Sequence, residues 1–207
     1  MESEILSESE SNSKKINIII CGAPGSGKGT QSAFIIEKYN LQHVSTGELL
    51  RQEIAKGNEL GKKADALISN GQLVPDDMII HLLEKKIDKL GPNHPKNGII
   101  LDGFPRTVNQ AEALENLCST KNAKIDILID LEVDDEELIK RILNRGKTSG
   151  RNDDNLETIR KRLDVYNKQT KPVLEFYKNL GKYVGIDGMG TMEEIFERIS
   201  KAIDEIK

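Results

Sequence analysis

Glycines and a lysine are concentrated in one short run near the start of the chain, Gly22-Ala-Pro-Gly-Ser-Gly-Lys-Gly-Thr30. The run follows an apolar stretch at residues 17–21 and precedes an amphipathic stretch that extends to about Tyr39. Glycines let backbone N–H groups surround a phosphate, and Lys28 would place a positive charge at the β- and γ-phosphates of a nucleotide. A simple turn with a surface lysine does not need four glycines in this strand-to-helix setting. We therefore interpret the run as a loop that binds a triphosphate.

The residue after Lys28 departs from the general pattern of such loops. A serine or threonine usually stands there and binds magnesium, whereas this chain has Gly29, followed by Thr30. Asp102 follows the apolar stretch at residues 99–101, and its carboxylate at the end of a strand could hold magnesium through water. The alternative is an ordinary aspartate in the turn after a strand.

A triphosphate loop can serve a switch, a motor or a kinase, so other residues are needed to decide among these classes of protein. The arginines are the most informative of them. Phosphoryl transfer requires cations around the transferred group more than it requires a nucleophile. The candidates flank predicted strand ends or a predicted helical insertion: Arg51, Arg106, Arg141, Arg145, Arg151 and Arg162. The alternative is that they are surface arginines paired with the many acids, as we expect for Arg160 and Lys161.

The polar segment 145–154 contains Gly146 and Gly150 and lies between two predicted helices. Such a segment could close over the site as a lid and exclude water, which would otherwise attack the triphosphate. Asp153 and Asp154 could pair with lid arginines on closure, although Asp154 could also cap the next helix.

Short stretches rich in Ile, Leu and Val recur along the chain, and longer amphipathic segments lie between most of them. This alternation predicts an α/β fold, a five-stranded parallel sheet with helices on both faces. The predicted strands are residues 17–21, 42–45, 99–101, 125–133 and 183–186. Helical stretches at 46–56, 60–70 and after Pro75 do not fit simple strand–helix–strand units, so we expect an inserted helical subdomain.

Three helix starts have the spacing of a capping box, in which a side chain caps the helix and a glutamate three residues later returns the bond. These are the pairs Ser45 and Glu48, Asp154 and Glu157, and Thr191 and Glu194.

Bulk properties restrict the class of protein. The chain has 207 residues, a net charge of −4 and two distant cysteines outside any metal-binding spacing. We expect a single domain at residues 15–207 after a disordered acidic tail at residues 1–14. The net charge argues against nucleic acid as a partner. The absence of a long apolar stretch argues against a membrane span, and the acidic N-terminus argues against a targeting signal, so we expect a cytoplasmic protein.

Several motifs together resemble the adenylate kinase family, in order and spacing, from about Ile16 to the end of the chain. They are the loop Gly22–Thr30 with Gln31, Ser45-Thr-Gly47 with Arg51, Gln72-Leu-Val-Pro75, Asp102-Gly-Phe-Pro-Arg106, Gln110, and Ser149-Gly-Arg151-Asn-Asp-Asp-Asn155. The resemblance implies a P-loop NTPase core, a monophosphate-binding subdomain at about 45–74 and a short lid at about 145–155. It also implies reversible γ-phosphoryl transfer from Mg-ATP to AMP, giving two ADP.

The resemblance assigns residues to the two nucleotides. For ATP it implies Gly25, Ser26, Gly27, Lys28, Gly29, Thr30, Arg141, Arg145 and the backbone near Gly190. For AMP it implies Thr46, Arg51, Gln72, Leu73, Val74, Gly103, Phe104, Pro105, Arg106 and Gln110, with Arg151 and Arg162 bridging the phosphates. The catalytic residues would be Lys28, Arg106, Arg145, Arg151 and Arg162, with Asp102 holding Mg²⁺ through water.

Two alternatives remain open at this point. Pyrimidine monophosphate kinases share the short lid but have alanine in place of Thr46 and asparagine in place of Thr107, so Thr46 and Gln110 favour adenine. A non-catalytic sensor could also bind ATP and AMP together. The lid lacks the cysteines with which some long-lid relatives hold zinc, so no structural zinc is expected. We expect a monomer that binds ATP, AMP and ADP and contacts neither nucleic acid nor membrane.

Overall fold

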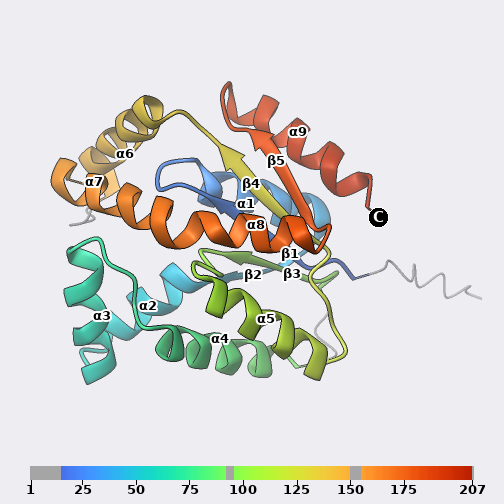
Figure 1. Ribbon diagram of the computed structural model, residues 1–207, viewed down its shortest axis with the longest axis horizontal. Coiled ribbons are helices and arrows are strands. Elements are labelled where there is room, and N and C mark those ends of the chain that lie inside the picture. Colours follow the sequence, from blue (N-terminus) through green and yellow to red (C-terminus); the bar gives the residue numbers. More distant parts are fainter. Residues whose placement is uncertain (1–14, 92–95, 150–154, 207) are drawn as a thin grey trace, which may run out of the picture.

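The computed structural model describes residues 15–91, 96–149 and 155–206. Its strands form one parallel sheet in the order β2-β3-β1-β4-β5, which confirms the predicted fold class (Figure 1). The bounds are β1 Ile18–Gly22, β2 Gln42–Ser45, β3 Ile99–Asp102, β4 Ile127–Glu132 and β5 Tyr183–Asp187. Strands β1 and β3 are adjacent, and their register pairs Ile20 with Asp102. The end of β3 therefore lies beside the start of the glycine-rich loop.

Alternate residues of β1 face opposite sides of the sheet, and each side has its own apolar core. Ile18 and Ile20 pack with Ile35 of α1 (Lys28–Tyr39) and Ile199 of α9 (Met192–Asp204). Ile19 faces the other core, which contains side chains from α4 (Asp76–Leu90), α5 (Val108–Thr120) and α8 (Lys171–Asn179). Burying one isoleucine side chain stabilises a fold by roughly 1.5–3 kcal/mol relative to leaving it exposed, so the apolar cores on both faces stabilise the sheet.

Two pairs of helices flank the end of the sheet at which the strands terminate. Helices α2 (Thr46–Ala55) and α3 (Glu59–Ser69) lie on one side, and α6 (Asp135–Ser149) and α7 (Leu156–Val165) lie on the other (Figure 1). The helices predicted at 46–56, at 60–70 and after Pro75 are thus present as α2, α3 and α4. Their assignment to a separate monophosphate-binding subdomain stays a prediction.

The chain passes from α7 to α8 through a π-helical turn, η1 (Tyr166–Thr170), which the sequence pattern did not predict. Turns of this kind are frequent at functional sites. Within the described part of the chain, no helix is both long and apolar enough to cross a membrane.

The helix starts confirm two of the three predicted caps and correct the third. Thr191 forms a complete capping box with Glu194, and Ser45 accepts a hydrogen bond from the backbone N–H of Glu48. Asn155, not Asp154, is the N-cap of α7, and its Oδ1 accepts from the N–H of Thr158 at 3.0 Å. Asparagine caps a helix as well as aspartate does, so either residue could serve as the cap. The helix starts one residue later than predicted.

The first part of the predicted lid is helical. Residues 145–149 continue α6, and the helix tolerates Gly146 at a cost of roughly 1 kcal/mol relative to alanine. Arg151, Asp153 and Asp154 lie outside the described residues, as does the predicted tail at 1–14. The lid and the tail therefore stay predictions.

Candidate active site

A cleft of about 1070 Å³ opens at the carboxyl ends of β1 and β3. Helices α2 and α3 contribute to one wall, and α6 and α7 contribute to the other. Ligands of open parallel sheets bind in this position, beyond the ends of the strands. The cleft is larger than most small-molecule pockets, which measure roughly 300–1,000 Å³, and so has room for more than one small ligand.

Most of the predicted site residues line this cleft. Those predicted to bind ATP are Gly25, Gly27, Lys28, Gly29, Thr30, Arg141 and Arg145. Those predicted to bind AMP are Thr46, Arg51, Gln72, Leu73, Val74, Gly103, Phe104, Pro105, Arg106 and Gln110. Arg162, predicted to bridge the phosphates, and Asp102, predicted to hold magnesium, also line the cleft. Two predicted residues do not line it: Ser26, which is 1% exposed within the loop, and Gly190, which lies in the turn after β5. Arg151 is outside the described residues.

The glycine-rich loop has a backbone that only glycine adopts without strain. Gly22, Gly25 and Gly27 have φ angles of +139°, +88° and +97°, in the region that L-residues with a Cβ avoid. A Cβ on Gly25 would also lie 2.8 Å from the carbonyl oxygen of Leu138. Gly27 is the N-cap of α1, so the N-terminus of that helix and its favourable dipole open into the loop.

Lys28 occupies the centre of the loop. Its Nζ donates to the carbonyl oxygens of Gly22 at 2.6 Å and Ala23 at 3.0 Å, and lies 3.4 Å from Ser26 Oγ. Burial lowers the pKa of Lys28 to about 8, although the carboxylate of Asp102 opposes this change. A lysine held in this way presents a charge that anionic phosphates would stabilise further, because each phosphate oxygen offers the ammonium a better partner than a carbonyl.

Asp102 ends β3 at the floor of the cleft, and its side chain is 17% exposed. Its Oδ2 lies 3.8 Å from His43 Nε2 on the neighbouring strand β2. Burial by itself raises the pKa of Asp102, but His43, Lys28 and Arg106 together outweigh burial, and the pKa is lowered. The side chain is therefore an ionised carboxylate near neutral pH, the donor type that magnesium prefers.

The wall of the cleft that is predicted to hold AMP is built around the carbonyl oxygen of Gly103. Thr46 Oγ1 and Arg106 Nε both donate to this oxygen at 2.8 Å. Thr170 Oγ1 of η1 donates to the carbonyl oxygen of Arg106 at 3.0 Å. The Nε bond orients the Arg106 side chain, and the bonds from Thr46 and Thr170 hold the backbone at Gly103 and Arg106 to which it is attached. Sequence reasoning missed Thr170 because its role depends on a π-helical turn without a sequence signature.

Gln110 is 2% exposed and both ends of its amide are engaged. Its Oε1 accepts from the backbone N–H of Arg106 at 2.7 Å, and its Nε2 donates to Asp76 Oδ1 at 2.6 Å. The second carboxylate oxygen of Asp76 accepts from Thr107 Oγ1 at 2.9 Å. The amide is thus held in one orientation by Asp76, a residue that sequence reasoning missed. Its position directly after the Gln72-Leu-Val-Pro75 motif was the available signal.

Five predicted arginines come together on the walls of the cleft, from α2, α6, α7 and the turn after β3. They are Arg51, Arg106, Arg141, Arg145 and Arg162. Arg141 Nε donates to Glu137 Oε1 at 2.9 Å, and its Nη2 donates to the carbonyl oxygen of Gly188 at 3.2 Å. By contrast, Lys161 forms the ordinary surface pair with Glu157 that was expected of it. A concentration of cations opposite a phosphate loop suits a site for two phosphorylated ligands.

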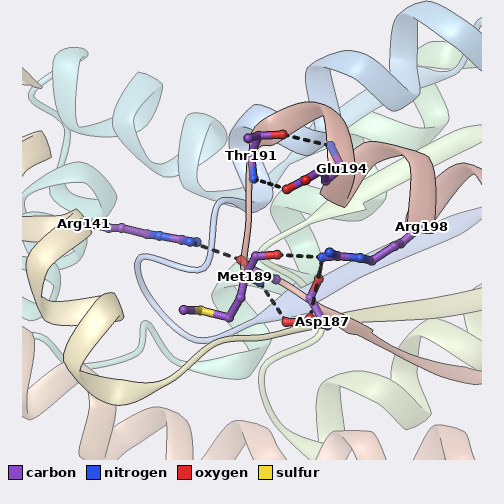
Figure 2. A network of polar contacts seen from close by, with 7 residues as sticks. Arg141, Asp187, Met189, Thr191, Glu194 and Arg198 are labelled. Carbon is purple, nitrogen blue, oxygen red and sulfur yellow. Dashed lines mark hydrogen bonds and ion pairs between the residues drawn. The ribbon is translucent and has the colours of Figure 1, made fainter.

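The predicted donor segment near Gly190 lies in the turn between β5 and α9 (Figure 2). Gly190 has a φ of +114°, and a Cβ there would lie 2.5 Å from Glu194 Oε2. Gln31 of α1 donates from Nε2 to the carbonyl oxygen of Met192 at 2.9 Å. This bond connects the helix that follows the phosphate loop with the start of α9. Among the described residues, Gly190 is not part of the lining of the cleft, so its predicted contact with ATP stays a prediction.

Comparisons with known proteins agree with this geometry. The family model described as adenylate kinase matches residues 20–182. A protein named adenylate kinase from Parabacteroides distasonis is 52% identical over 93% of this chain and 100% of its own length. Proteins of the same name from Bacteroides fragilis and Porphyromonas gingivalis are 53% and 50% identical, over 92% and 93% of this chain and 100% and 97% of their own lengths. The chain belongs to the adenylate kinase family, a family of phosphotransferases.

Proposed function

We propose that this chain catalyses the reversible transfer of the γ-phosphoryl group of Mg-ATP to AMP, giving two ADP. One observation carries the proposal: a single cleft combines a triphosphate loop with arginines from several other elements and with the buried amide of Gln110. A switch or a motor needs only the loop. A kinase also needs a second site whose phosphate faces the first, and the acceptor wall around Gly103 and Arg106 supplies it.

The donor role falls to the loop Gly25–Thr30, to Arg141 and Arg145, and to the backbone near Gly190. Lys28 would exchange its bonds to Gly22 and Ala23 for bonds to the β- and γ-phosphates, so its charge is available where the triphosphate binds. The N-terminus of α1 adds backbone N–H groups at the same place.

The acceptor role falls to Thr46, Arg51, residues 72–74, Gly103–Arg106 and Gln110. In this proposal Arg106 orients the AMP phosphate, and the Gln110 amide reads the adenine edge, since an amide both donates and accepts hydrogen bonds. Arg106 and Asp76 use one lone pair and one N–H of this amide, and a base that leaves the second N–H and the second lone pair unpaired is disfavoured, which favours adenine over a pyrimidine.

Magnesium enters with ATP, and Asp102 is the residue that would hold it through water. The ionised carboxylate faces the cleft beside Lys28, and magnesium characteristically keeps several of its waters. Over residues 15–91, 96–149 and 155–206, no group of three or more His, Cys, Asp or Glu side chains is placed to hold a metal ion. When bound, magnesium neutralises charge on the phosphate oxygens.

Transfer in this proposal is a direct in-line displacement without a covalent intermediate. The chain contributes position and charge: Lys28 at the donor phosphates, Arg106 at the acceptor phosphate, and Arg145 and Arg162 around the transferred group. Arg151 would join them from the lid. In this proposal the lid also excludes water, because water that entered an open site would attack ATP in place of AMP.

We also propose that the chain acts as a monomer in the cytoplasm, on small nucleotides and not on nucleic acid. The net charge of −4 supports the choice of ligand, because it offers no general attraction for a polyanion. Cys21 and Cys118 are free and buried, which suits a reducing compartment.

The test is an assay of ADP formation from Mg-ATP with AMP, CMP or UMP as acceptor. We expect AMP to be the preferred acceptor, whereas a sensor would bind both nucleotides without turnover. Lys28→Ala should lower kcat by at least about 100-fold, the scale of losing one preorganised donor. Lys38→Ala is the matched control, because Lys38 lies on the same helix but pairs with Asp204 on the surface. Near wild-type turnover in a folded Lys28→Ala protein contradicts the role of Lys28.

A further inference from the structure

Arginines from two different helices hold the turn that connects β5 to α9. Arg198 Nη1 donates to the carbonyl oxygens of Asp187 at 2.8 Å and Met189 at 2.6 Å. Arg141 donates to the intervening carbonyl oxygen of Gly188 from the opposite side, as Figure 2 shows. Three successive carbonyl oxygens of one turn therefore accept hydrogen bonds from guanidinium groups. Such charge-assisted bonds are stronger than those between neutral groups.

The N–H groups of the same turn are also engaged. The N–H of Gly188 donates to the carbonyl oxygen of Glu132 at 2.8 Å, and the N–H of Met189 donates to Asp187 Oδ1 at 2.9 Å. Asp187 Oδ2 in turn lies 3.7 Å from Arg198 Nη1. A turn held at both its donors and its acceptors does not depend on a ligand for its shape.

The position of Arg198 in α9 allows it to reach this turn. Glu194 and Arg198 are four residues apart and so lie on the same face of the helix. Glu194 accepts from the N–H of Thr191 at 2.8 Å, and Arg198 reaches past it to the carbonyl oxygens upstream. A Cβ on Gly190 would lie 3.6 Å from Arg198 Nη2, so the guanidinium lies near Gly190 as well.

We propose that Arg198 is a positioning residue for the donor nucleotide, which acts by fixing the backbone of residues 187–190 through the carbonyl oxygens of Asp187 and Met189. The inference rests on the proposed function, which assigns the backbone near Gly190 to ATP. Among the described residues, Arg141 lines the cleft and Arg198 does not. Arg198 therefore acts on the nucleotide only through the turn.

The physical reason is the cost of ordering a flexible turn when the ligand binds. Each residue whose backbone becomes fixed only on binding reduces the affinity, because the lost conformational entropy opposes binding. Arg198 fixes the turn in advance, so ATP binds to a surface that is already formed. AMP binds on the other wall and does not contact this turn, so its affinity should not depend on Arg198.

The experiment compares Arg198→Met and Arg198→Lys with Lys201→Met, a control on the exposed side of the same helix. Steady-state kinetics should be measured with ATP varied at saturating AMP and with AMP varied at saturating ATP. Arg198→Met removes both hydrogen bonds to the turn and should raise the KM for ATP by about tenfold, the scale of the entropy lost when about one more backbone residue is fixed on binding. The KM for AMP and kcat should stay within about twofold of wild type, and Arg198→Lys should recover part of the ATP affinity.

Each other outcome overturns the proposal or locates the error. An unchanged KM for ATP, or an equal rise in both KM values, shows that Arg198 has no specific effect on the donor. If Arg198→Met does not fold, the same comparison of ATP and AMP in Arg198→Lys decides the question. If wild-type protein forms no ADP from ATP and AMP, the proposed function fails instead, and this result is distinct from an active wild type with an unaffected Arg198→Met variant.

Discussion

Replacing Asp76 should reduce the preference for AMP, although Asp76 is not assigned to either nucleotide. Its two carboxylate oxygens accept from Gln110 Nε2 at 2.6 Å and from Thr107 Oγ1 at 2.9 Å. The carboxylate only accepts, so the NH₂ end of the Gln110 amide must face it. The carbonyl end must then face the backbone N–H of Arg106, as it does at 2.7 Å. Asp76 thereby determines which amide atoms remain to meet the base.

The size of the effect follows from the burial of Gln110, which is 2% exposed. Asp76→Ala leaves the NH₂ group of the buried Gln110 without its carboxylate partner, at a cost of roughly 1–3 kcal/mol. The bond to Asp76 holds the Gln110 amide in the orientation that pairs with adenine. Losing this bond should lower the ratio of kcat/KM for AMP to that for CMP by about tenfold. Asp76→Asn keeps the shape and one acceptor oxygen but loses the charge, so its effect should be smaller, at roughly threefold.

The assay measures ADP formation at saturating Mg-ATP with AMP or CMP varied, and thermal melting monitors stability in parallel. Asp77→Asn is the matched control. Asp77 also lies in the first turn of α4, so its replacement has a similar effect on the helix dipole, but its side chain is exposed. We expect the ratio for Asp77→Asn to equal that of wild type.

Two results refute this reasoning in different ways. A wild-type ratio in folded Asp76→Ala, with a reduced ratio in Gln110→Ala, shows that Gln110 reads the base without orientation by Asp76. A wild-type ratio in both variants shows that Gln110 does not read the base.

Two further predictions concern Lys28 and Gly98. The pKa of Lys28 is about 8 and lysine is charged below its pKa, so kcat/KM for ATP should fall as the pH rises through this value. Lys28→Arg keeps the charge, and a fall that persists in that variant contradicts the assignment. Gly98 has a φ of +132° and a Cβ there would collide with the carbonyl oxygen of Ile16, so Gly98→Ala should destabilise the fold by more than about 3 kcal/mol in denaturant unfolding. Gly57 has a φ of +66° and open space around it, so Gly57→Ala should cost only about 1 kcal/mol. Equal losses of unfolding free energy in the two variants would show that the collision with Ile16 is relieved.

The strands and most helices could be predicted because their residues carry the signal locally. Residues 17–21 and 99–101 are nearly continuous apolar runs, as expected for strands buried on both faces, and they correspond to β1 and β3. The glycine-rich loop could be predicted equally well, because the glycines at positive φ and Lys28 are close together in the sequence.

Features that depend on tertiary contacts could not be predicted in this way. The π-helical turn η1 arises where α7 meets α8, and no residue type marks it. The start of α7 was misplaced by one residue because Asp154 and Asn155 are both good caps and the sequence does not rank them. The extension of α6 to Ser149 was missed because a polar, glycine-containing segment reads equally as loop or as exposed helix.

Asp76 and Arg198 show where motif-based prediction stops. The motifs predict groups that face the nucleotides, such as Gln110 and the backbone near Gly190, and both groups are flexible in isolation. An amide can rotate by 180° and a glycine-containing turn can adopt many conformations, so neither group binds its nucleotide well until another side chain fixes it. Asp76 fixes the first with a carboxylate, and Arg198 fixes the second with a guanidinium. We therefore expect the preference for AMP and the affinity for ATP to change through these supporting residues, without any change in the residues that are predicted to face the ligands.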